Sequence, residues 1–377
     1  MDASYAPPED GAGEAWRRAA PGETGLAPPM LAEAAAFAEA HETPWARDIE
    51  AVIAGGYFEP PPWNEIIGPV APRGGPCGIV LHRGLIVAEW GDTRRVDMTF
   101  SVAKSYLGLL AGIAFDRGLI PDLDERVGRR IDDGGFASPH NAKVTWRHLL
   151  QQTSEWEGTL WGKPDLVDRN RDLSREGRGR KGEPRPLQEP GTYWEYNDVR
   201  VNRLALSLLR VFGRPLPEIF AEAFMEPIGA SSDWRWHGYR NSWVEIDGRR
   251  MQSVSGGGHW GGGVFIGARD QARLGLMMLR GGVWGERRLL SERWIALSTT
   301  PCPLNRQYGL LWWLNSGGAR HAGSPEACYC AVGAGGNLTW IDPVNDLVAV
   351  LRWTDPSAVG GFLDRLAVAL PGTRGGP

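Results

Sequence analysis

The sequence is poor in lysine and cysteine, and it has no long hydrophobic run. Only four of its 41 basic residues are lysines, so arginine carries almost every positive charge. Four cysteines in 377 residues do not suggest a disulfide scaffold, and we expect free thiols and a cytoplasmic location. Because no run of about 18 apolar residues occurs, we expect no segment that spans a membrane.

A net charge of −4 gives no electrostatic reason to expect a nucleic-acid partner, and a homodimer stays open. Cys328 and Cys330 would share one face of a strand, but no cluster of histidine or cysteine completes a metal site around them. We therefore expect no metal and no cofactor. Tryptophan, in contrast, is abundant at 18 residues, which predicts aromatic-lined pockets as well as core positions.

Strand patterns lie near both ends of the chain, and helical patterns lie between them. Residues 77–92 indicate a β-hairpin because Arg83-Gly84 interrupts an apolar run, and 336–342 and 346–353 are two further strand-like runs. Helical patterns cover 28–41, 144–156, 197–213, 268–282 and 356–369. This order predicts an α+β fold in which antiparallel strands form a discontinuous sheet domain.

Two segments show neither pattern. Residues 1–27 are acidic and rich in proline and glycine, and they lack the apolar stretch of a secretion signal, so we expect a flexible extension. Residues 168–191 are irregular and polar, and the basic run 169–185 is interleaved with acidic residues. A solvated loop explains this run better than a phosphate-binding patch, and a role as a lid stays open.

Ser101 and Lys104 are the first candidates for chemistry. They stand three residues apart at the start of an apolar helical pattern, so their side chains share a face and can touch. A serine hydroxyl becomes nucleophilic when a neighbouring base removes its proton, and a lysine whose ammonium form is disfavoured can be that base. The helix start also offers backbone N–H groups to an oxyanion. The alternative is the polar start of a helix that is simply buried.

Two further segments supply partners for this pair. Tyr196 stands at the start of the next strong helical pattern, where its hydroxyl could deliver a proton to a leaving nitrogen. Gly333 lies in the strand-like stretch 328–343, along which a substrate could meet backbone N–H groups. The alternatives are a tyrosine that packs with its aromatic neighbours and a simple turn at the glycines.

Ser101-x-x-Lys104, Tyr196-Asn197-Asp198 and the glycine-containing strand, in this order, resemble the serine β-lactamase/penicillin-recognising superfamily in its class C and esterase branch. Over residues 70–355 the chain looks most like amide and ester hydrolases of the 6-aminohexanoate-dimer hydrolase type.

The resemblance implies a fold and a set of roles. The fold would be an antiparallel sheet flanked by helices, with a sheet domain of 28–117 plus 251–377 and an inserted all-helical domain at 118–250. The catalytic site would lie at their junction. Ser101 would attack, Lys104 would take its proton, and Tyr196 would relay a proton to the leaving group, while the backbone N–H groups of Ser101 and Ala334 would hold the oxyanion.

Two positions depart from the class C pattern. Asp198 stands in place of asparagine, and Ala331-Val332-Gly333 stands in place of Lys-Thr-Gly. The missing lysine removes the group that would bind a β-lactam carboxylate. Asp198 would further oppose an anionic substrate, although it could also pair with Lys104. A neutral amide or ester, or one with a cationic amine, therefore fits better than a penicillin.

Asp198, Gly333, His259, Trp260 and Trp161 are weaker candidates for substrate contacts, and for His259 a packed or solvated side chain is the stronger interpretation. The glycines around His259 match a dinucleotide-binding motif by letter, but no strand-to-helix unit surrounds them.

We predict a metal-independent serine hydrolase that cleaves small amides or esters through an acyl-enzyme. Two alternatives remain. One is a non-catalytic binding or scaffold protein of the same fold, and the other is a β-lactamase or D-amino-acid peptidase.

Overall fold

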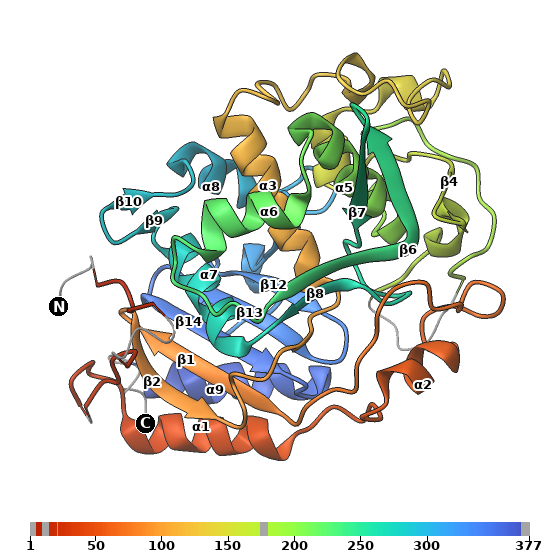
Figure 1. Cartoon of the computed structure of the whole chain (residues 1–377). Coiled ribbons are helices and arrows are strands. Elements are labelled where there is room, and N and C mark those ends of the chain that lie inside the picture. Colours follow the sequence, from red (N-terminus) through yellow and green to blue (C-terminus); the bar gives the residue numbers. More distant parts are fainter. Residues whose placement is uncertain (1–4, 10–14, 21, 174–179, 371–377) are drawn as a thin grey trace.

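The computed structural model describes residues 5–9, 15–20, 22–173 and 180–370 (Figure 1). Its centre is an antiparallel six-stranded sheet with the strand order β11-β12-β13-β14-β1-β2. The strands are β1 (Cys77–His82), β2 (Leu85–Trp90), β11 (Trp313–Leu314), β12 (Tyr329–Gly333), β13 (Asn337–Asp342) and β14 (Leu347–Arg352). Because β1 pairs with β14, strands from both ends of the chain meet in one sheet, and the predicted α+β fold is confirmed.

The predicted hairpins form where the sequence places their turns. Arg83 and Gly84 both have positive φ, 55° and 79°, which suits a two-residue turn between twisted strands. Between β13 and β14, the Asp342 carboxylate accepts hydrogen bonds from the N–H groups of Val344 and Asn345, at 3.0 and 3.1 Å.

Helices cover both faces of this sheet. The helices α1 (Pro28–Ala40) and α9 (Val359–Ala369) pack on one face, and α7 (Ala268–Leu279) packs on the other (Figure 1). Side chains along each strand point to alternate faces of the sheet, so one strand contributes to both cores. Val80 faces α1 and α9, while its neighbours Ile79 and Leu81 belong to the core on the other side.

Most of the remaining elements lie on the same side of the sheet as α7 (Figure 1). The helix α3 (Val102–Asp116) is buried from Val102 to Ala114 and contacts α5, α8 and β12. The other helices are α2 (Ile49–Ala54), α4 (Trp146–Leu150), α5 (Asp198–Phe212), α6 (Leu216–Phe220) and α8 (Glu292–Ser298). A second sheet has the order β3-β8-β6-β7, with β3 (Asp97–Met98), β6 (Arg235–Ile246), β7 (Arg249–Val254) and β8 (Gly263–Ile266). Two short ribbons pair β4 (Thr159–Leu160) with β5 (Lys163–Pro164), and β9 (Val283–Trp284) with β10 (Arg287–Arg288).

The structure corrects the prediction of an all-helical segment at 118–250. Residues 235–254 form the β6–β7 hairpin, which turns at Asp247-Gly248, with φ of 50° and 73°. An Asp-Gly pair between alternating residues is a strong hairpin signal, and here it sets the two strands. The helix predicted at 144–156 is also too long, because α4 ends at Leu150 and both Gln152 and Glu155 have positive φ. The other predicted helices match α1, α5, α7 and α9 closely.

The prediction of a flexible extension at 1–27 is wrong for the residues that the structure describes there. Residues 17–19 run beside β2, with the Ile86 N–H donating to Arg17 O and the Ala19 N–H donating to Ile86 O, each at 3.0 Å. The buried Trp16 indole donates to Gly84 O at 2.9 Å. The hydrogen bonds and apolar burial therefore fix this part of the chain to the sheet.

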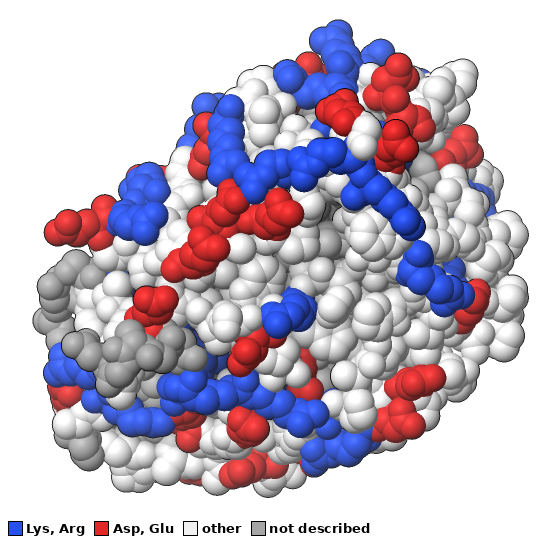
Figure 2. Space-filling model, in the orientation of Figure 1, with Lys and Arg blue, Asp and Glu red and all other residues white. Residues whose placement is uncertain are grey.

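All four cysteines are free thiols. No described helix combines the length and apolarity that crossing a bilayer requires. On the face shown in Figure 2, acidic and basic side chains lie interspersed, in keeping with the small net charge of −4.

Candidate active site

Ser101 directly precedes the first residue of α3, and its position depends on the backbone of Phe100 before it. Phe100 has a φ of 50°, which is rare for a bulky side chain and requires support from the surroundings. That support is an aromatic cluster, because the Phe100 ring lies edge-on to Trp45 at 5.4 Å and to Trp353 at 6.3 Å between centroids. Ser101 itself lines a cleft of about 890 Å³.

Lys104 lies one helical turn beyond Ser101 and contacts it directly. Its Nζ donates a hydrogen bond to Ser101 Oγ at 2.8 Å, and its side chain is 1% exposed. The same ammonium group forms an ion pair with Asp198, so the pairing that the sequence left open is present. Gly257 leaves room for the pair, since a Cβ there would lie 2.6 Å from Asp198 Oδ1 and 2.8 Å from Lys104 Nζ.

Tyr196 lies beside this pair on the segment that leads into α5. Lys104 Nζ and the guanidinium carbon of Arg171 each lie 4.9 Å from the centroid of its ring. Trp313 stacks on the ring at 5.5 Å and 27°. The cleft therefore brings Ser101 and Tyr196 together around Lys104, which are the three predicted catalytic residues.

Asp198 is buried and charge-paired. Its Oδ2 accepts from Arg171 at 2.8 Å and lies 2.9 Å from His259 Nδ1. Burial alone would raise the pKa of the Asp198 carboxyl, but the interaction with His259 and the charges of Lys104 and Arg171 outweigh it and hold the pKa well below its usual range. Asp198 is therefore a carboxylate whose charge its partners neutralise.

The contacts of His259 define its tautomer. Arg171 Nη2 lies 3.2 Å from Nε2 and can only donate, so Nε2 is the acceptor. The proton then sits on Nδ1, which faces Asp198 and also Glu59 Oε1 at 3.1 Å. His259 lines the cleft with this neutral ring stacked on Phe58, at 4.1 Å and 13°. The sequence favoured a packed or solvated side chain for His259. In the structure this side chain is buried and also lines the cleft.

Glu59, Asp168 and His259 come close enough to hold a metal ion. Lys181 already supplies a positive charge there, because its Nζ lies 2.6 Å from Glu59 Oε1 and 3.0 Å from Asp168 Oδ1. An ammonium group in this position competes directly with any cation for the same two carboxylates.

The C-terminal end of β12 forms the opposite side of the cleft. A Cβ on Gly333 would lie 1.9 Å from Thr99 O, so only glycine lets this strand approach the backbone that precedes Ser101. The next residue, Ala334, also lines the cleft, and its carbonyl accepts from Asn337 Nδ2 at 2.7 Å. Gly333 and Ala334 therefore line the same cleft as Ser101, and their contacts with a substrate and an oxyanion stay predictions.

The two predicted tryptophans lie elsewhere. Trp260 is fully buried, and its indole donates to Trp63 O at 2.8 Å. Trp161 lies in the turn between β4 and β5, where its carbonyl accepts from Asn241 Nδ2 at 2.9 Å. In the described part of the chain neither residue lines the cleft, whereas Trp194 and Trp313 do.

The basic run 169–185 is solvated only in part. Within its described residues, the Arg180 side chain is 73% exposed, whereas those of Arg171, Lys181 and Arg185 are only 12%, 8% and 11% exposed, and each of these three pairs with buried carboxylates. Several of the partners, such as Asp198 and Glu155, lie far away in sequence, so the run gave no local sign of them. The question of a lid falls partly on residues 174–179, outside the described chain.

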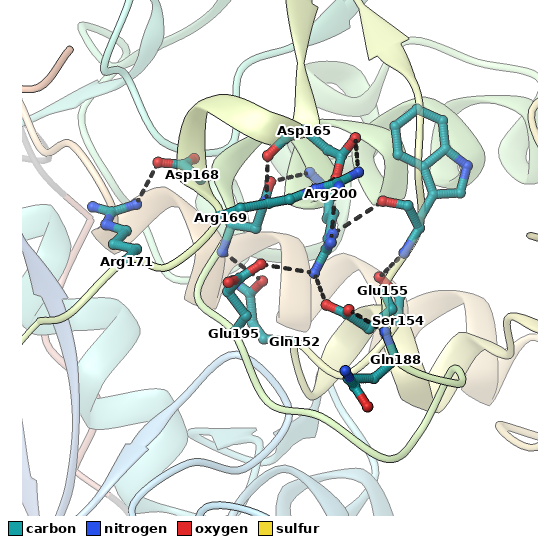
Figure 3. A network of polar contacts seen from close by, with 12 residues as sticks. Gln152, Ser154, Glu155, Asp165, Asp168, Arg169, Arg171, Gln188, Glu195 and Arg200 are labelled. Carbon is teal, nitrogen blue, oxygen red and sulfur yellow. Dashed lines mark hydrogen bonds and ion pairs between the residues drawn. The ribbon is translucent and has the colours of Figure 1, made fainter. Parts of the chain in front are cut away.

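A second ionic network fixes the segment that carries Tyr196 and Asp198 (Figure 3). Arg200, 1% exposed, donates to Glu155 Oε1 at 2.7 Å and to Asp165 Oδ2 at 3.3 Å, and Arg185 bridges Glu155 to Glu195. Asn197 caps α5 and donates its side-chain N–H to Asp165 O at 2.9 Å. The network thereby determines where α5 begins and where Tyr196 points.

Replacing Arg200 with methionine should lower the free energy of unfolding by about 3 kcal/mol or more, because buried carboxylates lose their partner. Arg214→Met is the matched control, since Arg214 pairs with Glu218 and Glu222 on the surface and should cost at most about 1 kcal/mol. Chemical denaturation of both variants measures the difference. Equal, small losses would contradict the structural role given to Arg200.

The pKa of Glu155 predicts how stability depends on pH. Burial alone would raise this pKa, but hydrogen bonds from Arg185 and the charge of Arg200 lower it from 4.5 to about 2. The stability that this carboxylate contributes is therefore complete above pH about 4.5 and is lost as the pH falls toward 2. Urea unfolding between pH 6 and 3 should show decreasing stability, with a weaker decrease in Glu155→Gln. An identical slope in the variant would contradict this assignment.

Comparison with known proteins agrees with this geometry. A sequence model of the beta-lactamase family matches residues 92–371. The 6-aminohexanoate-dimer hydrolase of Paenarthrobacter ureafaciens is 30% identical over 134 residues, covering 30% of this chain and 32% of the relative. The match thus spans about a third of that relative's length.

Solved structures share the fold. A family VIII carboxylesterase aligns with a TM-score of 0.57 at 19% identity, over 91% of this chain and 96% of its own. EstA from Arthrobacter nitroguajacolicus Rue61a aligns with a TM-score of 0.55 at 20% identity, over 78% and 90%. The family match covers most of the chain, including the segments that place Ser101, Lys104 and Tyr196 together, and the protein belongs to the beta-lactamase family of serine hydrolases.

Proposed function

We propose that the protein hydrolyses small amides or esters through an acyl-enzyme formed on Ser101. The observation that carries the proposal is the 2.8 Å contact between Lys104 Nζ and Ser101 Oγ in the cleft, with Tyr196 beside it. A nucleophile within hydrogen-bond reach of a base, which is itself oriented by a third group, is the arrangement that activates a serine hydroxyl. Here Asp198 is the orienting group.

In the proposed reaction Lys104 acts in its neutral amine form, and Ser101 attacks the carbonyl carbon while the Lys104 amine takes the hydroxyl proton. The Asp198 carboxylate stabilises the ammonium that results. The backbone N–H groups of Ser101 and Ala334 stabilise the oxyanion, and Tyr196 passes a proton to the leaving group. Water then releases the acyl group by the same steps in reverse.

The names of related proteins support this reaction type. The curated relative is called a 6-aminohexanoate-dimer hydrolase, which names amide cleavage, and one of the aligned structures is called a carboxylesterase. The chain has Ala331-Val332-Gly333 at the end of β12, without the lysine that would contact a β-lactam carboxylate there. We therefore place β-lactams among the poor substrates.

A substrate screen tests the proposal. We expect hydrolysis of p-nitrophenyl esters and of small linear anilides at rates well above the buffer control, and slow turnover of a chromogenic cephalosporin. D-amino-acid amides form a third arm, in which fast turnover would favour a peptidase. No hydrolysis in any arm would favour the non-catalytic binding protein instead.

A further inference from the structure

A side pocket of about 200 Å³ adjoins the catalytic cleft between the β12–β13 face and α9. Arg320, Val332, Gly333 and Pro356 line both cavities, so the two meet at the end of β12. The walls of the side pocket are largely apolar, and they include Leu338, Trp340, Val359, Gly360 and Leu363. A substrate held beside β12 thus has an apolar recess next to it.

Arg320 connects this recess with the catalytic residues. Its guanidinium carbon lies 4.8 Å from the centroid of the Trp313 ring, and Trp313 stacks on Tyr196. A single aromatic ring therefore separates Arg320 from the proposed proton relay. Burial raises the pKa of the Cys330 thiol, which lines the side pocket, and the nearby Arg320 guanidinium opposes that rise. These contacts hold the guanidinium at the junction of the two cavities.

Arg320 differs in its ion pairing from the other two described arginines that line the cleft. Arg171 is paired with Asp198 and Asp168, and Arg180 is paired with Glu183. In the part of the chain that the structure describes, no carboxylate forms an ion pair with Arg320. A guanidinium binds a carboxylate through two parallel hydrogen bonds, which makes it the side chain best suited to recognise that group.

We propose that Arg320 and the side pocket form a subsite for a carboxylate carried by the acyl chain or the leaving group of the substrate. This inference rests on the proposed function, because it names a feature of the substrate that Ser101 would attack. It also revises the expectation that the site favours neutral or cationic substrates. Arg320 offers a positive charge over the Trp313 ring, at a different place from Ala331, and Lys104 and Arg171 neutralise Asp198, so that Asp198 does not repel an anion.

Two pairs of matched esters test the subsite and locate the carboxylate. For the acyl side, p-nitrophenyl pentanoate is compared with the p-nitrophenyl half-ester of glutaric acid. For the leaving-group side, 3-carbamoylphenyl butyrate is compared with 3-carboxyphenyl butyrate. We expect wild type to prefer the carboxylated member in at least one pair, as kcat/KM, by about tenfold.

Arg320→Met should reduce that preference by about tenfold or more, because a hydrogen-bonded charge pair is lost. Arg287→Met, an exposed arginine on β10, is the matched control and should leave the preference intact. A wild type without preference in either pair would overturn the subsite. So would an Arg320→Met variant that loses activity equally on both members of a pair.

Gly360→Leu tests the recess itself. A Cβ on Gly360 would meet nothing within 4 Å, so a larger side chain can enter the side pocket without backbone strain. The variant should lose most of the preference for the carboxylated ester, whereas Val368→Leu, on the exposed side of the same helix, should keep it. An unchanged preference in Gly360→Leu would remove the side pocket from the proposal.

Failure of the subsite and failure of the proposed function give different results. If Ser101-dependent hydrolysis of the neutral esters is present without carboxylate preference, only the subsite is wrong. If no ester is hydrolysed, the function is wrong, and titration calorimetry with glutarate decides the subsite. Binding by wild type that Arg320→Met abolishes would support it, and no binding would overturn it.

Discussion

Ser101→Ala should reduce kcat/KM for p-nitrophenyl butyrate by about 10³-fold or more, to near the rate of the buffer reaction. The reason is that Ser101 carries the hydroxyl that Lys104 contacts in the cleft. Ser101 Oγ lies at the base of the cleft, 2.8 Å from Lys104 Nζ. Steady-state kinetics with a subtracted buffer blank measure the loss. The fold should be unaffected, because the alanine keeps the α3 entrance and removes only one hydrogen bond.

The control for this result is Ser105→Ala on the same helix. The Ser105 hydroxyl donates to Leu311 O at 2.7 Å, away from the cleft lining. Its loss should cost about 1 kcal/mol of stability and leave the kinetics close to wild type. A Ser101→Ala variant with wild-type kinetics would contradict the assignment of the nucleophile, and it would favour the non-catalytic alternative.

Lys104→Arg should lower kcat by about 10²- to 10⁴-fold while keeping the positive charge. Arginine can maintain the ion pair with Asp198, but its guanidinium cannot be deprotonated in a protein, so it cannot accept the serine proton. The variant therefore separates proton transfer from charge pairing. The measurement is kcat on the same ester, together with thermal unfolding to show that the folded state persists.

Lys143→Arg is the matched control for that experiment. Lys143 lies on the surface, 46% exposed, where it pairs with Glu189. It should have no effect on kcat. If Lys104→Arg retained wild-type turnover, Lys104 would serve only as a charge, and the base would have to be another group, with Tyr196 the nearest candidate.

The parts of the fold and site that the sequence predicted depend on local signals. Arg83-Gly84 specifies the β1–β2 turn within two residues, and Ser101 and Lys104 are linked by a single helical turn. Asp247-Gly248 is an equally local signal for the β6–β7 turn.

The charge pairing could not be predicted, because it joins residues that are distant in the sequence. Arg171 and Asp198 are 27 positions apart, and Lys181 and Glu59 are 122 positions apart. Composition shows that a run is basic, but only the folded chain shows which carboxylates it meets. For the same reason the burial of Arg171, Lys181 and Arg185 within the basic run could not be foreseen.

The aromatic lining of the cleft illustrates the same limit. Sequence offers no means of telling Trp260, which donates its indole proton to Trp63 O in the core, from Trp313, which stacks on Tyr196. Arg320 likewise carries no motif. Its place depends on how the segment before β12 folds back over Trp313.

The central claim is that Ser101 becomes acylated. Its most direct test is intact-protein mass spectrometry after treatment with a fluorophosphonate, followed by peptide mapping. The account predicts one adduct per chain, on Ser101, and none in Ser101→Ala. An unlabelled wild type, or an adduct at another residue that persists in Ser101→Ala, would contradict it.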